Sequence, residues 1–188
     1  MKKILAVPVV VCCALVMLTL ACCSQTAANQ DSKKSYSEII GERLVSFTDC
    51  ANAFSASLEQ IADRSYAPSD KQTADIQDKL ERLEKACAGL AGLKAPARYA
   101  EAQKALDEAM ADYADAIDKC SALLEFYGAY DDMFRKYSNP KDGSAEIEKK
   151  ERALYDSFSA AMQKATDSFR NACEKFDSVK TNNTTTGK

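Results

Sequence analysis

The stretch YAEAQKALDEAMADYADAIDKCSALLEFYG, residues 99–128, decides the fold. Its large apolar side chains recur mainly in steps of three, four and seven residues, and residues at these steps lie on one face of an α-helix. We therefore predict a long amphipathic helix over about 97–137, with Pro96 suited to its first turn and Gly128 as a candidate bend. The stripe consists of Tyr99, Leu106, Met110, Tyr113, Ile117, Cys120, Leu124 and Tyr127, widened by Ala102, Ala109 and Ala116.

Local signals mark where the other helices begin. Ser35 is followed by Glu38 and Ser69 by Gln72, and each pair has the spacing of a capping box. The breaker-rich stretch SNPKDGS, residues 138–144, separates the last two helices. Because short connections make consecutive helices antiparallel neighbours, we expect an all-α fold, an elongated antiparallel four-helix bundle. Its helices are expected at about 36–65, 70–90, 97–137 and 145–179.

Composition agrees with a single helical domain. The chain of 188 residues has only six glycines and four prolines, and it lacks the alternation of Val, Ile and Thr that is typical of strands. Residues 35–179 are long enough for one hydrophobic core. The polar, aperiodic tail 180–188 is expected to be disordered.

The amino-terminal residues have the layout of a secretory signal. Lys2 and Lys3 form a cationic start, and the segment 4–20 that follows is apolar and uncharged. An uncleaved membrane anchor is the alternative, since roughly 20 apolar residues can span a bilayer. Both interpretations place the chain in the cell envelope, tethered to a membrane on its extracytoplasmic side.

Two cysteines follow this apolar segment in the sequence TLACCSQT, residues 19–26. The residues before Cys22 resemble the lipobox of bacterial lipoprotein precursors. In that family the cysteine receives a diacylglyceryl group and becomes the new amino terminus, and two acyl chains suffice for stable anchoring. The resemblance implies a signal peptide over 1–21 and lipidation at Cys22, with Cys23 as the alternative. Residues 22–34 would then form the lipidated cysteine and a flexible tether.

A second resemblance covers about a fifth of the chain. The segment LEKACAGLAGLKAPARYAEAQKALDEAMADYADAI, residues 83–117, is similar to a helix, a proline-containing break and a helix found in helical lipoproteins of bacteria. This resemblance implies a helical bundle. It implies nothing about activity.

Four cysteines lie in the expected helices, in a compartment where disulfides can form. Cys50 and Cys87 are nearly equidistant from the first turn, so they are candidates for a disulfide across the first hairpin. Cys120 and Cys173 differ in height by roughly 16 Å, which is too far for a bond. The alternative is that all four behave as small buried apolar side chains.

The chain has no histidine, which removes the commonest general base and metal ligand. We therefore expect neither an enzyme nor a metal or other cofactor. Removing residues 1–21 takes away Lys2 and Lys3 and no acidic residue, so the net charge changes from −3 to −5, which argues against a nucleic-acid partner. The carboxylates of Asp107, Asp112, Asp115 and Asp118 are expected to form a solvated face.

Unequal helix lengths predict an overhang. At 1.5 Å per residue the second helix is roughly 31 Å long and the third roughly 61 Å, so the last hairpin should extend about 30 Å beyond the first, away from the tether. Aromatic side chains concentrate there and would suit a protein, peptide or glycan partner, unless they pack between the helices. The candidates for partner binding are Tyr127, Tyr130, Phe134, Tyr137 and Tyr155.

These features favour a non-enzymatic lipoprotein that serves as an interaction or envelope-structural module. A lipoprotein that binds a small ligand or a peptide in a cleft among the helices is the alternative.

Overall fold

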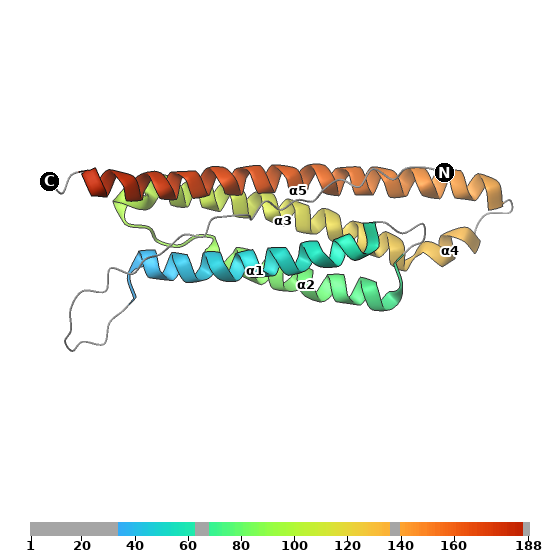
Figure 1. Ribbon diagram of the computed structural model, residues 1–188. Helices are drawn as coiled ribbons and strands as arrows, with labels where there is room; N and C mark the ends of the chain where they lie inside the picture. Colours follow the sequence, from blue (N-terminus) through green and yellow to red (C-terminus); the bar gives the residue numbers. More distant parts are fainter. Residues whose placement is uncertain (1–33, 63–67, 136–139, 186–188) are drawn as a thin grey trace.

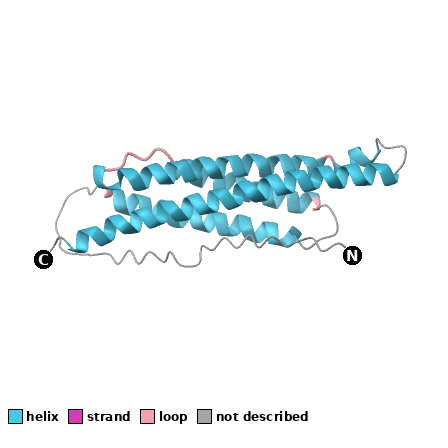
Figure 2. Ribbon diagram, turned by 90° about the horizontal axis from the view of Figure 1, so that it is seen from above, coloured by secondary structure: helices cyan, strands magenta, loops and turns pink. Residues whose placement is uncertain are grey.

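The computed structural model describes residues 34–62, 68–135 and 140–185. Within these ranges every regular element is a helix (Figures 1 and 2), so the expected all-α fold is confirmed. The elements are α1 (Tyr36–Ala62), α2 (Asp70–Leu90), the short 3₁₀ helix η1 (Ala97–Tyr99), α3 (Ala100–Gly128), α4 (Tyr130–Arg135) and α5 (Pro140–Thr185).

The four long helices form the expected antiparallel bundle. Helices α1 and α2 pack as one hairpin, α2 packs on α3, and α3 packs along α5. In Figure 1, α5 runs the length of the molecule beside α3, and the α1–α2 hairpin lies along the other side. The chain therefore builds a long, narrow molecule from up-and-down helices.

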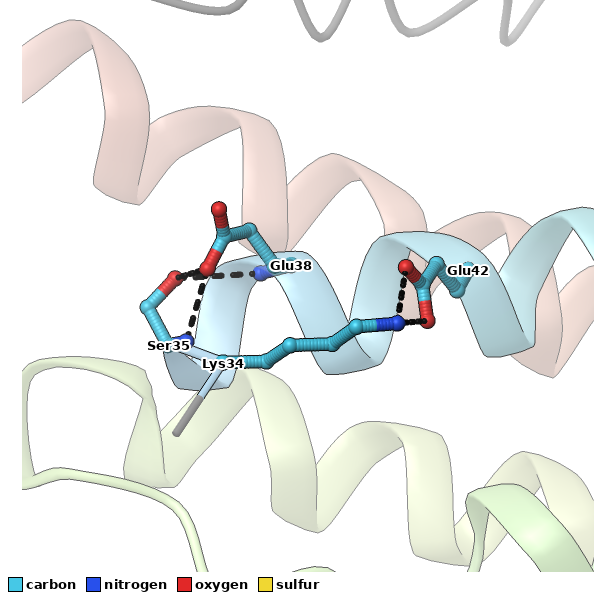
Figure 3. Close-up of polar contacts among 4 residues, drawn as sticks. All are labelled: Lys34, Ser35, Glu38 and Glu42. Atoms are coloured by element: carbon cyan, nitrogen blue, oxygen red, sulfur yellow. Dashed lines mark hydrogen bonds and ion pairs between the residues drawn. The ribbon is translucent and has the colours of Figure 1, made fainter. Parts of the chain in front are cut away.

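Both capping boxes are present. At the start of α1 the backbone N–H of Ser35 donates to Oε2 of Glu38 at 2.7 Å, and the backbone N–H of Glu38 donates to Oγ of Ser35 at 3.3 Å (Figure 3). Lys34 adds an ion pair with Glu42 at 2.6 Å. Ser69 and Gln72 make the same reciprocal bonds ahead of α2. These bonds satisfy N–H groups that a helix start otherwise leaves without partners.

The third helix differs in detail from the single helix expected over 97–137. It begins with the 3₁₀ turn η1, and α3 ends at Gly128, one residue before α4. The backbone N–H of Ala129 donates back to the carbonyls of Glu125 and Phe126, at 3.1 and 3.3 Å. Glycine is a poor helix former, which explains why the chain breaks at the bend expected there.

The last helix is longer than the 145–179 expected from the sequence. It begins at Pro140, inside the stretch that the sequence predicts to be a turn. Proline is well suited to the first turn of a helix, which explains this earlier start. It ends at Thr185, so the backbone of residues 180–185, expected as part of a disordered tail, continues the helix. With 46 residues, α5 is about 69 Å long.

Aromatic rings join the helices at three levels of the core. In the middle, Phe47 of α1 lies 5.0 Å from Tyr113 of α3 and 4.8 Å from Phe169 of α5, measured between ring centroids. Such pairs are each worth about 0.5–1.5 kcal/mol beyond the area that they bury. The other levels are formed by Phe54 with Phe158, and by Tyr36 with Tyr99 and Phe176.

A buried polar network fixes the connection between α2 and α3. The amide nitrogen of Gln103, a residue only 4% exposed, donates to the carbonyl of Leu90 at 3.2 Å and to Asp107 at 2.7 Å. Its amide oxygen accepts from the hydroxyl of Tyr36 at 2.5 Å. Asp107 also accepts the backbone N–H of Gly92, whose φ of 68° is a conformation that favours glycine. The network ties the start of α1 to both helices of the connection.

Candidate interaction surface at the overhanging end

The expected overhang is present. In Figure 1, α4 and the first turns of α5 extend past the described ends of α1 and α2, at the right of the view. The start of α1 lies toward the opposite end of the bundle, the end at which α5 finishes. Side chains of the overhang therefore lie far from the residue where the described chain begins.

Where the overhang begins, a tyrosine of α3 is hydrogen-bonded to a glutamate of α5. The hydroxyl of Tyr127 donates to Oε1 of Glu151 at 3.0 Å. Burial raises the pKa of Tyr127 far above its ordinary value, and the charge of Glu151 raises it further. Tyr155 and Tyr130 lie close enough to contribute to the same effect. The three tyrosines and Glu151 thus form one cluster, which we call the tyrosine cluster.

Tyr130 of α4 connects this cluster to the apolar interior. Its ring meets that of Phe126 edge to face, with centroids 6.0 Å apart, and Phe126 is only 5% exposed. Burial raises the pKa of Tyr130, and the charges of Glu151 and Glu148 add to the rise. Two carboxylates therefore lie near this phenol, while the Nζ atom of Lys150 lies over the Phe126 ring, 5.8 Å from its centroid.

The structure brings together three of the five aromatic residues singled out in the sequence. Tyr127, Tyr130 and Tyr155 are each half-buried, so their rings pack against the helices while part of each side chain remains accessible. The side chain of Phe134 and the whole of Tyr137 lie outside the described residues. So do Cys22 and Cys23, the expected lipidation sites.

Sequence reasoning missed the acidic side of this surface. Glu148, Glu151 and Tyr155 follow one another at steps of three and four, so they share one face of α5. The spacing of these residues predicts that they share a face. The contact between Glu151 and Tyr127 of α3 cannot be predicted from spacing, because it depends on the register between the two helices.

Cys50, Cys87, Cys120 and Cys173 are in the reduced thiol form in the structure. Cys87 is buried and Cys50 half-buried. Burial raises the pKa of Cys87 to about 12, and the Cys50 thiol adds to the rise. Their joining in a disulfide stays a prediction. Burial alone raises the pKa of Cys120 to about 12.

The acidic residues of α3 connect helices or pair locally. Asp112 accepts from Ser168 of α5 at 2.6 Å and forms an ion pair with Lys164 at 2.8 Å. Asp115 pairs with Lys119 one turn further along α3. Among the residues that the structure describes, no group of three or more acidic or cysteine side chains is placed to hold a metal ion.

Fold and surface together define a class: an all-α, antiparallel four-helix bundle with a tyrosine cluster near one end. Comparisons with family models, with curated proteins and with solved structures gave no match for this chain. None of the described helices is long and apolar enough to cross a membrane.

Proposed function

We propose that the chain is an extracytoplasmic lipoprotein, anchored in a membrane through Cys22, whose bundle is a non-enzymatic interaction or envelope-structural module. The amino-terminal sequence supports the anchor, because a cationic start, an apolar segment and a cysteine occur in the order of a lipoprotein precursor. Residues 22–34 would link the lipid to α1.

One observation supports the interaction role above all others. Helix α1 begins at Tyr36, directly after the proposed tether, and its other end lies toward the overhang (Figure 1). The tyrosine cluster lies near that other end of the bundle, because Phe158 of α5, one turn from Tyr155, contacts Phe54 of α1. A chain held at one end would present the other end to partners away from the membrane. Tyrosine is enriched at the energetically dominant positions of protein interfaces.

The chemistry of the cluster suits binding better than catalysis. Burial and nearby carboxylates raise the pKa values of Tyr127, Tyr130 and Tyr155, so these phenols keep their protons at neutral pH. A neutral phenol donates and accepts hydrogen bonds but is a poor general base. The chain also has no histidine that could act as a general base.

Photo-crosslinking in the native envelope tests this proposal. We would replace Tyr130 by p-benzoylphenylalanine in the full chain and irradiate intact cells. The matched control carries the same group in place of Val45, an exposed side chain of α1. We expect one dominant adduct from position 130 and none of that mass from position 45. Identical adduct patterns at both positions, or none at position 130, would contradict the interaction role.

A further inference from the structure

Two buried apolar side chains near the overhang lie apart from the main core. Phe126 of α3 is 5% exposed and Ile147 of α5 is 3% exposed. Neither belongs to the continuous cluster of buried side chains that joins the four long helices. Apolar side chains outside the main core need a cover of their own to stay away from water. We call Phe126 and Ile147 the satellite residues.

The short helix α4 covers the satellite residues. The 3.0 Å hydrogen bond between Tyr127 and Glu151 shows the register of α3 against α5. Ile147 lies four residues before Glu151, about 6 Å farther out along α5, and α3 has ended at that level. Among the described elements, α4 is the one that packs on α5 there. The ring of Tyr130 in α4 also meets that of Phe126 edge to face, with centroids 6.0 Å apart.

Helix α4 is joined to the bundle in a way that allows it to detach. It has six residues, and Ala129 alone separates it from α3. A side chain added at Gly128 would meet no atom within 4 Å beyond its chain neighbours and the backbone of its own helix, so the space around the bend is open. A helix this short is not stable by itself, so α4 depends on its contacts with the satellite residues. Segments held by few buried contacts open locally while the rest of a protein stays folded.

We infer that α4 is an autoinhibitory cap, and that the satellite residues beneath it form a docking site for an amphipathic helix of a partner protein. The inference rests on the proposed interaction role and names the partner's chemistry. Helix α4 itself shows what fits the site, because Tyr130 and Met133 lie one turn apart and both are half-buried. A partner helix with an aromatic and an apolar residue at this spacing would replace α4, which is the helix-in-groove mode of recognition.

A peptide with the sequence of α4 tests the inference on the full chain in detergent micelles. Tyr130→Ala removes the ring that covers Phe126 and so loosens the cap. The probe is a fluorescent, hydrocarbon-stapled helix of residues 129–138, followed by anisotropy. We expect it to bind Tyr130→Ala at least about tenfold more tightly than the unaltered chain, because a covered site lowers the apparent affinity in proportion to the fraction that is open. Equal affinity for both chains would overturn the inference.

Matched variants separate the site from non-specific binding. Ile147→Asp, added to Tyr130→Ala, places a charge in the proposed site and should return the affinity to that of the unaltered chain. Val45→Asp in the same background places this charge on an exposed position of α1 and should leave the affinity within about twofold. Peptide binding that survives Ile147→Asp, or a dimer of the Tyr130→Ala chain that excludes the peptide, would overturn partner docking.

Hydrogen exchange of the unaltered chain tests the cap without any substitution. The amides of α4 should exchange through an opening that leaves Leu106 and Tyr113 of α3 protected, because the four long helices stay packed when α4 detaches. Exchange of α4 only together with these core amides would show that α4 and the bundle open as one unit. That result would overturn the inference.

The outcomes for the cap and for the proposed role are independent. If the crosslinker at position 130 captures a partner while the peptide binds both chains equally, the interaction role stands and the cap is wrong. If the peptide requires a loosened cap and the crosslinker captures nothing, the docking site exists but the proposed role fails.

Discussion

Phe47 of α1 and Tyr113 of α3 meet edge to face, with ring centroids 5.0 Å apart and planes at 78°. Phe169 of α5 contacts both rings, at 4.8 Å from Phe47 and 6.3 Å from Tyr113. One layer of three rings thus joins three helices. Phe47 and Tyr113 are both fully buried, so the layer lies inside the core.

Replacing Phe47 by Ala should lower the free energy of unfolding by about 3–5 kcal/mol, because the cavity left by a buried ring is only partly refilled. Urea unfolding followed by circular dichroism measures the loss. The control Val45→Ala changes a side chain of the same helix that is 60% exposed, and should stay within about 0.5 kcal/mol. Similar losses in both variants would show that Phe47 is not at the centre of the core.

Gln103→Leu should destabilise the chain by about 1–3 kcal/mol, because it removes the buried partner of Tyr36 and of the Leu90 carbonyl. Tyr36→Phe removes one donor only and should cost about 0.5–1.5 kcal/mol. Hydrogen exchange should show the first turns of α1 opening more readily in both variants. Unchanged exchange there would mean that the network does not hold α1.

The helices could largely be predicted from the sequence because their signals are local. Steps of three and four placed Tyr113 and Ile117 on the buried stripe of α3, and the capping boxes at Ser35 and Ser69 marked two helix starts correctly. These features depend on residues less than two turns apart. The amino-acid sequence specifies them without reference to any other helix.

Contacts between helices could not be predicted in the same way. Gln103 is polar, yet it is buried because Tyr36 and the carbonyl of Leu90 supply its partners from other elements. The bond between Tyr127 and Glu151 likewise depends on the register of α3 against α5. The sequence predicts a turn where α5 in fact begins at Pro140, because Pro and Gly are typical helix breakers and the packing that supports the helix there comes from other elements.

Acidification should weaken the polar contacts of Asp112 in α3 with Lys164 and Ser168 in α5. Partial burial alone would raise the pKa of Asp112, but hydrogen bonds from Lys164 and Ser168 and the charge of Lys164 hold it below its ordinary value. A carboxyl whose pKa is lower in the folded state stabilises the fold above its unfolded pKa, near about 3.9, and loses that contribution as pH falls through the folded value.

Asp112→Asn should therefore be less stable than the unaltered chain by about 1 kcal/mol at pH 7, with the difference vanishing well below pH about 3.9. Urea unfolding at several pH values measures this difference. A difference that persists unchanged at the lowest pH would show that the effect of Asp112 is not electrostatic.

Mild oxidation of the folded chain by a disulfide reagent should link Cys50 to Cys87 before either reacts with Cys120. The Cys50 thiol already influences the pKa of Cys87, whereas burial alone accounts for the raised pKa of Cys120. Peptide mapping without reduction identifies the pair. Formation of the bond would release two thiols from the reagent for each disulfide made, and a Cys50–Cys120 peptide as the main product would refute the prediction.

The most direct test of the proposed anchor is the intact mass of the chain purified from its native membrane, followed by mapping of its first peptide. The proposal predicts a peptide that begins at Cys22 and carries the mass of a diacylglyceryl group. An unmodified peptide that begins at Met1 would contradict lipid anchoring, and would make the apolar segment 4–20 the anchor instead.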